Sequence, residues 1–151
     1  MYSLVRRFLK TAIGFLIVGL ALGVWMIAER DLAGRFPSPY VRSAHTHAIL
    51  VGFVMMMILG VALWLFPRPA KDDARYAPRV AEASYWLVAM GTAVRIVAEV
   101  ALAHVDGLWL RVSTVLAGTI QAVGIGLFFY TMWSRIRPAG SQSREAQGER
   151  F

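Results

Sequence analysis

The sequence predicts an all-α membrane protein, a bundle of four antiparallel transmembrane helices, and three observations support this class. Hydrophobic residues make up 58% of the 151 residues and charged residues only 17%. The charges avoid four long apolar runs, at about 11–28, 43–66, 81–103 and 109–133. Each run is close to the length of about 20 residues with which a helix crosses the hydrocarbon layer. The runs are apolar on all sides, whereas the helices of a water-soluble bundle carry one apolar stripe.

The connections between the runs are too short for a separate soluble domain, so we expect residues 1–137 to form one domain of consecutive antiparallel helices. Basic residues collect on the cytoplasmic side of membrane proteins. Eleven flank the runs on the side of the two termini: Arg6, Arg7, Lys10, Arg68, Lys71, Arg75, Arg79, Arg135, Arg137, Arg144 and Arg150. Four lie on the other side: Arg30, Arg35, Arg42 and Arg111. We therefore expect both termini in the cytoplasm and a multi-pass location in the cell (inner) membrane. The net charge of +7 is then explained by contact with lipid headgroups of the bilayer, so a nucleic-acid partner is not expected.

The first run is longer than the usual core of a cleaved signal peptide and lacks an obvious cleavage site, so we interpret it as a retained helix. It carries Gly19 and Gly23, and the fourth run carries Gly118, Ala122 and Gly126 at four-residue spacing. Such patterns let helix backbones pack closely, here within one chain rather than along a dimer seam. Residues 138–151 are polar and charged, which predicts a disordered cytoplasmic tail.

The second run begins with Arg42-Ser-Ala-His45-Thr-His47-Ala48 and holds two of the three histidines. Residues two apart on a helix point about 200° from each other, so His45 and His47 cannot bind one iron unless the turn is distorted. Gly52 follows His45 by seven residues and should lie on the same face, where it would leave room beside a planar ring. The absence of cysteine excludes thiolate metal sites and covalent haem attachment, which leaves histidine as the candidate iron ligand.

The third run contains Arg95 and Glu99, which are neighbours on a helix surface because they are four residues apart. An arginine at membrane depth costs about 2.5–3.5 kcal/mol on insertion scales, so its charge should be compensated. Three interpretations remain open: an internal ion pair, an Arg95 that binds an anionic group such as a haem propionate, and a Glu99 that relays protons. His104 closes this run near the outer face, where His45 and His47 also lie.

The segment Arg42-x-x-His45-Thr-x-Ala48 resembles the start of the second helix in the catalytic subunit of haem-copper oxidases, in particular the C-type oxidases and nitric oxide reductases. The likeness extends more thinly to Leu65-Phe-Pro67 and to Tyr76-Ala-Pro-Arg79. In that family the segment supplies a histidine ligand to a low-spin haem b near the outer face. The resemblance thus implies a non-covalent haem b on His45, whereas His47 stands where the family commonly has asparagine.

That subunit has about twelve helices, and its second haem ligand and its copper histidines come from later ones. The resemblance therefore implies a truncated, four-helix relative without its own binuclear centre, which acts in electron transfer or in binding of a gas such as NO or O₂ and does not form a complete oxidase or reductase alone. His104 is the intramolecular histidine that could oppose His45 across the haem. Otherwise the sixth position is open, or is filled by a methionine such as Met56, by a neighbouring protomer of a homo-oligomer or by a larger respiratory complex. Arg42 and Arg111, on the outer side, complete the candidate cofactor-binding residues with His47, Gly52 and Arg95.

Other functions remain in view. The chain could be a non-catalytic accessory or assembly subunit of a membrane respiratory complex, with the oxidase-like segment as a packing surface. A copper site could form from the three histidines with Met55, Met56 or Met57, since imidazole and thioether suit copper. No sequence pattern specifies quinone binding near Arg95 and Glu99.

Overall fold

The computed structural model describes residues 2–67, 77–136 and 147–148, and all regular secondary structure in these ranges is helical. The elements are α1 (Tyr2–Asp31), α2 (Pro39–His47), the π-helix η1 (Ala48–Met55), α3 (Met56–Leu65), α4 (Pro78–Leu102), α5 (Leu108–Met132) and the short 3₁₀ turn η2 (Trp133–Arg135). Because α2, η1 and α3 are continuous, they form one segment, here called the second span. Four helical segments are long and apolar enough to cross a membrane, which confirms the four predicted helical spans. The predicted tail lies outside the described residues, except for 147–148.

The helix boundaries follow from local chemistry. Proline, which lacks a backbone N–H, opens α2 at Pro39 and α4 at Pro78, where the first turn of a helix needs no such donor. The Ser38 hydroxyl accepts a hydrogen bond from the backbone N–H of Tyr40 at 3.3 Å and so caps α2. Gly34, in the turn after α1, has a φ of 63°, a conformation that side chains with a Cβ rarely adopt.

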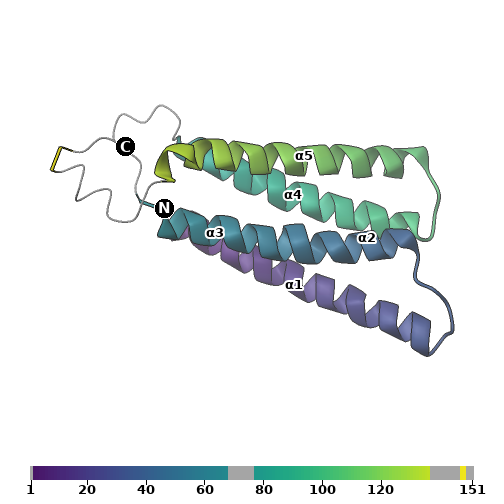
Figure 1. Cartoon of the computed structure of the whole chain (residues 1–151). Coiled ribbons are helices and arrows are strands. Elements are labelled where there is room, and N and C mark those ends of the chain that lie inside the picture. Colours follow the sequence, from purple (N-terminus) through teal and green to yellow (C-terminus); the bar gives the residue numbers. More distant parts are fainter. Residues whose placement is uncertain (1, 68–76, 137–146, 149–151) are drawn as a thin grey trace.

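The helices pack as two pairs, α1 with the second span and α4 with α5 (Figure 1). The start of α1, the end of α3, the start of α4 and the end of α5 lie at one end, here called the terminal end. Phe8 contacts both Tyr85 and Phe128 there, and Arg135 donates a hydrogen bond to the Leu63 carbonyl. At the opposite end, here called the loop end, α1 diverges from the other helices toward the connection that leads to α2 (Figure 1).

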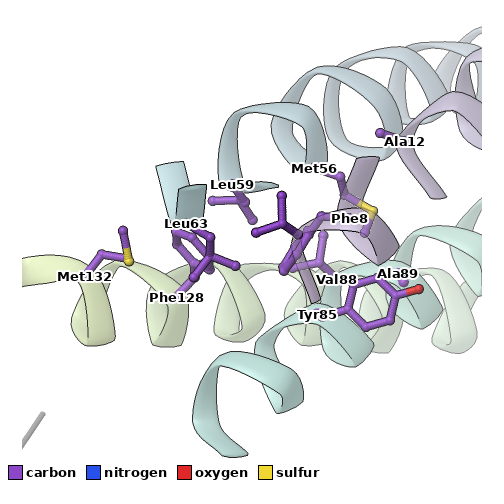
Figure 2. Packing of buried hydrophobic residues seen from close by; sticks show 11 residues of the cluster. Phe8, Ala12, Met56, Leu59, Leu63, Tyr85, Val88, Ala89, Phe128 and Met132 are labelled. Atoms are coloured by element: carbon purple, nitrogen blue, oxygen red, sulfur yellow. The ribbon is translucent and has the colours of Figure 1, made fainter. Parts of the chain in front are cut away.

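A hydrophobic core occupies the terminal half of the bundle, and all four spans contribute to it (Figure 2). Phe8 is fully buried, and its ring meets Tyr85 and Phe128 edge to face at centroid distances of 5.1 and 5.9 Å. Lipid chains are as apolar as leucine, so this core stabilises the fold through close packing and not through removal of apolar surface from water. Polar contacts between the helices occur at both ends: Thr11 bonds to Tyr85 in the terminal half, and the contacts of the histidines lie nearer the loop end.

Candidate functional site

A cleft of about 620 Å³ opens between α1 and α2 at the loop end, where α1 diverges. Its volume is within the range of about 300–1,000 Å³ that is typical of sites for small molecules and cofactors. Its lining comes from one face of α1, from the following loop and from α2: Gly23, Met26, Ile27, Arg30, Phe36, Pro37, Arg42 and His45. The cleft therefore combines an apolar wall with one imidazole and two guanidinium groups.

The imidazole of His45 is held against α1 by a hydrogen bond and by a glycine. Its Nδ1 lies 2.8 Å from the backbone carbonyl oxygen of Gly19. A carbonyl only accepts hydrogen bonds, so Nδ1 must carry the proton and the neutral ring has its lone pair on Nε2. A Cβ added at Gly23 would lie only 3.1 Å from Cε1 of His45. The Gly19-x-x-x-Gly23 pair thus forms a seat for the ring, in addition to the close helix packing that its spacing predicted.

Gly52 faces α1, but it does not leave an open space beside a planar ring. A Cβ at Gly52 would lie 2.5 Å from Cγ of Phe15, so the Phe15 ring of α1 already fills this room. The free space expected from the sequence beside Gly52 is therefore not present. The physical reason is that α1 packs directly on η1, whereas the open space lies nearer the loop end, beside Gly23.

His47 points away from the cleft and toward α4. Its Nδ1 donates a hydrogen bond to the Ser43 carbonyl at 2.8 Å and lies 3.7 Å from Oε2 of Glu99. The Ser43 hydroxyl donates to Oε1 of Glu99 at 2.8 Å, and Nε of Arg95 donates to the same oxygen at 3.0 Å. Glu99 is 2% exposed, and its Oε2 has no hydrogen-bond partner among the described residues. These four residues form a cluster between α2 and α4, here called the Glu99 cluster.

The structure does not bring the other candidate residues to the cleft. The His104 ring stacks on Trp25 with a centroid distance of 6.1 Å, and α4 has ended at Leu102 before it. Arg111 pairs with Asp106 at 2.8 Å in the loop between α4 and α5. Arg95 lies against α5, where a Cβ at Gly118 would be 2.7 Å from its Nη1.

The methionines that were considered as ligands lie elsewhere too. Met56 is fully buried in the hydrophobic core, and Met55 and Met57 pack against that core. Within the part of the chain that the structure describes, no group of three or more histidine or acidic side chains could hold a metal. His45 bonds to Gly19, His47 lies beside Glu99, and His104 stacks on Trp25. The three rings therefore do not converge, and the alternative copper site has no geometric support here.

Sequence reasoning missed two features. The first is the His45 seat, because glycine spacing on α1 does not reveal which side chain of another helix fills it. The second is Arg135, which was counted as a flanking cytoplasmic charge but is 1% exposed. Its guanidinium donates to the carbonyls of Leu63, Phe66 and Pro67 at 2.7–3.2 Å and so satisfies the end of α3. The signal for it is an arginine directly after an apolar span, which is common and therefore weak.

The cleft fits a haem that is bound through one imidazole. The lone pair of His45 on Nε2 can coordinate iron, and Met26, Ile27, Phe36 and Pro37 provide an apolar wall for a porphyrin. Arg42 has no ion-pair partner among the described residues, whereas Arg30 is paired with Asp31 at 2.7 Å. Arg42 is thus the better placed of the two for a propionate.

Comparison with known proteins gives one family. The family model described as "Cytochrome C and Quinol oxidase polypeptide I" matches residues 3–144, nearly the whole chain. No curated protein and no solved structure matched the chain.

Proposed function

The chain belongs to the cytochrome c and quinol oxidase polypeptide I family, and we propose that it is a membrane haem protein that binds one non-covalent haem b through Nε2 of His45. One observation carries this proposal, the hydrogen bond of 2.8 Å from Nδ1 of His45 to the Gly19 carbonyl. Histidines that bind metals usually donate their other ring N–H in this way, which fixes the tautomer and the ring orientation.

The other residues of the cleft have supporting roles in this proposal. Ile27 and Phe36 shield the porphyrin faces from water, and Arg42 pairs with a propionate at the loop end. Gly23 keeps the His45 ring close to α1, which a larger side chain would prevent. When bound, a haem on one histidine supplies a one-electron redox couple and, where its sixth position is open, a place for a diatomic gas.

The arrangement of donors favours gas binding over bis-histidine electron transfer. His104 stacks on Trp25 and does not line the cleft, and Met56 is enclosed in the core. Met26 is the one sulfur donor that lines the cleft among the described residues. We therefore propose that the sixth position stays open unless Met26, a second copy or a partner of a larger respiratory complex fills it.

We further propose that the four spans form an antiparallel bundle with both termini in the cytoplasm, in the inner (cell) membrane. The excess of basic residues on the side of the termini supports this orientation. The cleft and the Glu99 cluster then lie toward the outer face. We do not expect this chain by itself to reduce oxygen or nitric oxide. That reaction in the haem-copper oxidases requires a second metal beside the haem, and the three histidines of this sequence are too few to bind both.

An absorption spectrum of the protein purified in mild detergent from haem-replete cells tests the proposal. Wild type should carry about one haem per chain, and His45→Ala should lose the haem band while the protein stays inserted. His104→Ala is the matched control and should keep both the haem and its spin state. Ready carbon monoxide binding by the reduced wild type would support an open sixth position. A wild type without haem would refute the proposal in favour of an accessory or assembly role.

A further inference from the structure

The orientation of α2 about its own axis decides which histidine faces the cleft, and contacts with α1 and α4 support this orientation. Directly after His47, the eight residues Ala48–Met55 have π-helical geometry, which is rare, occurs mostly as short insertions in α-helices and is frequent at functional sites. The α-helical register of α3, which is anchored in the hydrophobic core, is therefore interrupted before it reaches α2. Backbone hydrogen bonds continue across the junction, where the Ala48 N–H bonds to the carbonyls of Ala44 and His45, and side-chain contacts of α2 with α1 and α4 add to them.

Polar contacts hold α2 on two sides. Toward α1, His45 donates to the Gly19 carbonyl at 2.8 Å. Toward α4, the Ser43 hydroxyl donates to Oε1 of Glu99, also at 2.8 Å. Apolar contacts accompany them: Ala44, Ala48 and Ile96 form a small buried cluster against which Phe15, Leu22 and Val100 pack.

Glu99 is itself fixed in place. It is 2% exposed, and Nε of Arg95, one turn earlier on α4, donates to the same Oε1 at 3.0 Å. Arg95 in turn packs against α5 at Gly118. The groups that face Glu99 are thus Arg95 from its own helix and Ser43 and His47 from α2, with Arg95 as the compensating charge.

We propose that Glu99 is a positioning residue for His45. Through the Ser43 hydroxyl, Glu99 holds α2 in the rotation that places the His45 ring at the cleft. The inference rests on the proposed haem function, and it adds a residue on α4 that lies outside the cleft. Without the Ser43 to Glu99 hydrogen bond, α2 loses a contact on the α4 side, its position relative to α1 is less well defined, and the hydrogen bond of His45 to Gly19 weakens.

The test compares Ser43→Ala with Ser43→Thr, which keeps a hydroxyl, and with Ser84→Ala as the matched control. Ser84 is also a buried serine, but its hydroxyl donates to Val80 within α4, remote from the cleft. We expect Ser43→Ala to bind haem and lose it to apomyoglobin about tenfold faster than wild type, the change that corresponds to one hydrogen bond to a charged group. Ser43→Thr and Ser84→Ala should lose haem at the wild-type rate.

A second readout needs no haem. In protein with ¹⁵N-labelled histidine, the His45 ring should show a protonated Nδ1 in wild type, in Ser43→Thr and in Ser84→Ala, and an averaged tautomer signal in Ser43→Ala. Glu99→Gln, which keeps an acceptor oxygen for Ser43, should retain the wild-type signal, whereas Glu99→Leu should not. If Ser43→Ala matches Ser84→Ala in both readouts, the positioning role is wrong. If wild type binds no haem but the tautomer signals change as expected, the haem function fails and the positioning role stands.

Discussion

The interaction between Arg95 and Glu99 can be measured directly, because the two side chains meet inside one membrane helix. The perturbation is a double-mutant cycle of Arg95→Leu, Glu99→Leu and the double variant. Glu99→Leu leaves a guanidinium that is 24% exposed without its carboxylate and removes the acceptor of the Ser43 hydroxyl. Arg95→Leu leaves a carboxylate that is 2% exposed with only Ser43 and the His47 ring beside it.

The expected magnitude follows from distance and burial. Two unit charges at the Nε–Oε1 separation of 3.0 Å attract by about 5.5 kcal/mol at an effective dielectric constant of about 20. The loss of hydration opposes this attraction, and removal of one member of a buried pair costs about 3–5 kcal/mol because the other charge stays buried. Two leucines restore an apolar contact, so we expect the double variant to lose only about 2 kcal/mol, mainly through Ser43. The coupling free energy, the sum of the two single losses less the loss of the double variant, should then be about 4 kcal/mol or more.

The assay is equilibrium unfolding in mixed micelles of a mild and a denaturing detergent, with the fraction of folded protein followed by tryptophan fluorescence. The exposed pair of Arg111 and Asp106 provides the matched control. Its side chains are 57% and 73% exposed, and the corresponding cycle should give a coupling of about 0–1 kcal/mol. Strictly additive losses at Arg95 and Glu99, or a coupling no larger than that of the control pair, would refute the buried ion pair.

Three further predictions follow. Reporter fusions at Phe36 and Asp106 should give an external signal, since both residues lie in the connections with few basic residues, and a cytoplasmic signal at either would contradict the proposed topology. Gly23→Ala should weaken haem binding while the protein stays folded, because the new Cβ would come within 3.1 Å of the His45 ring; unchanged haem affinity by titration would show that the seat is not needed. Arg135→Leu should lower the free energy of unfolding by about 3 kcal/mol or more, since it removes charged hydrogen bonds to three carbonyls at the end of α3, and equal unfolding curves for variant and wild type would contradict that role.

The spans could be predicted from the sequence because they depend on length and composition alone. The bilayer requires about 20 apolar residues for each crossing, and glycine and polar residues inside a run do not change that. The opposite directions of His45 and His47 followed in the same way from the periodicity of a helix. In the structure, one ring indeed contacts α1 and the other lies beside α4.

The partners of these rings could not be predicted, because they depend on which helix faces which and at what height. Gly52 shows this clearly: its place on the same face as His45 was predicted, but the Phe15 ring that fills its space belongs to another helix. The π-helix Ala48–Met55 adds a second difficulty, since its wider turns change the faces that a regular helix assigns to later residues. The direction of the His104 ring could not be predicted for a third reason: it depends on where α4 ends and on the neighbouring Trp25.

The concentration of the hydrophobic core in the terminal half of the bundle explains how α1 can diverge at the other end without loss of the fold. At the terminal end, Phe8 of α1 is enclosed by rings of α4 and α5, and the contacts of Thr11 with Tyr85 and of Arg7 with Glu82 also fix α1 there. Toward the loop end, α1 meets α2 through Gly19 and Gly23 and the hydrogen bond of His45, and this leaves the cleft open beyond them. A cofactor that fills this cleft would add contacts to the least supported part of α1. Haem binding should therefore protect the backbone amides of the last turns of α1 against hydrogen exchange more than those near Phe8, which are already stable without it.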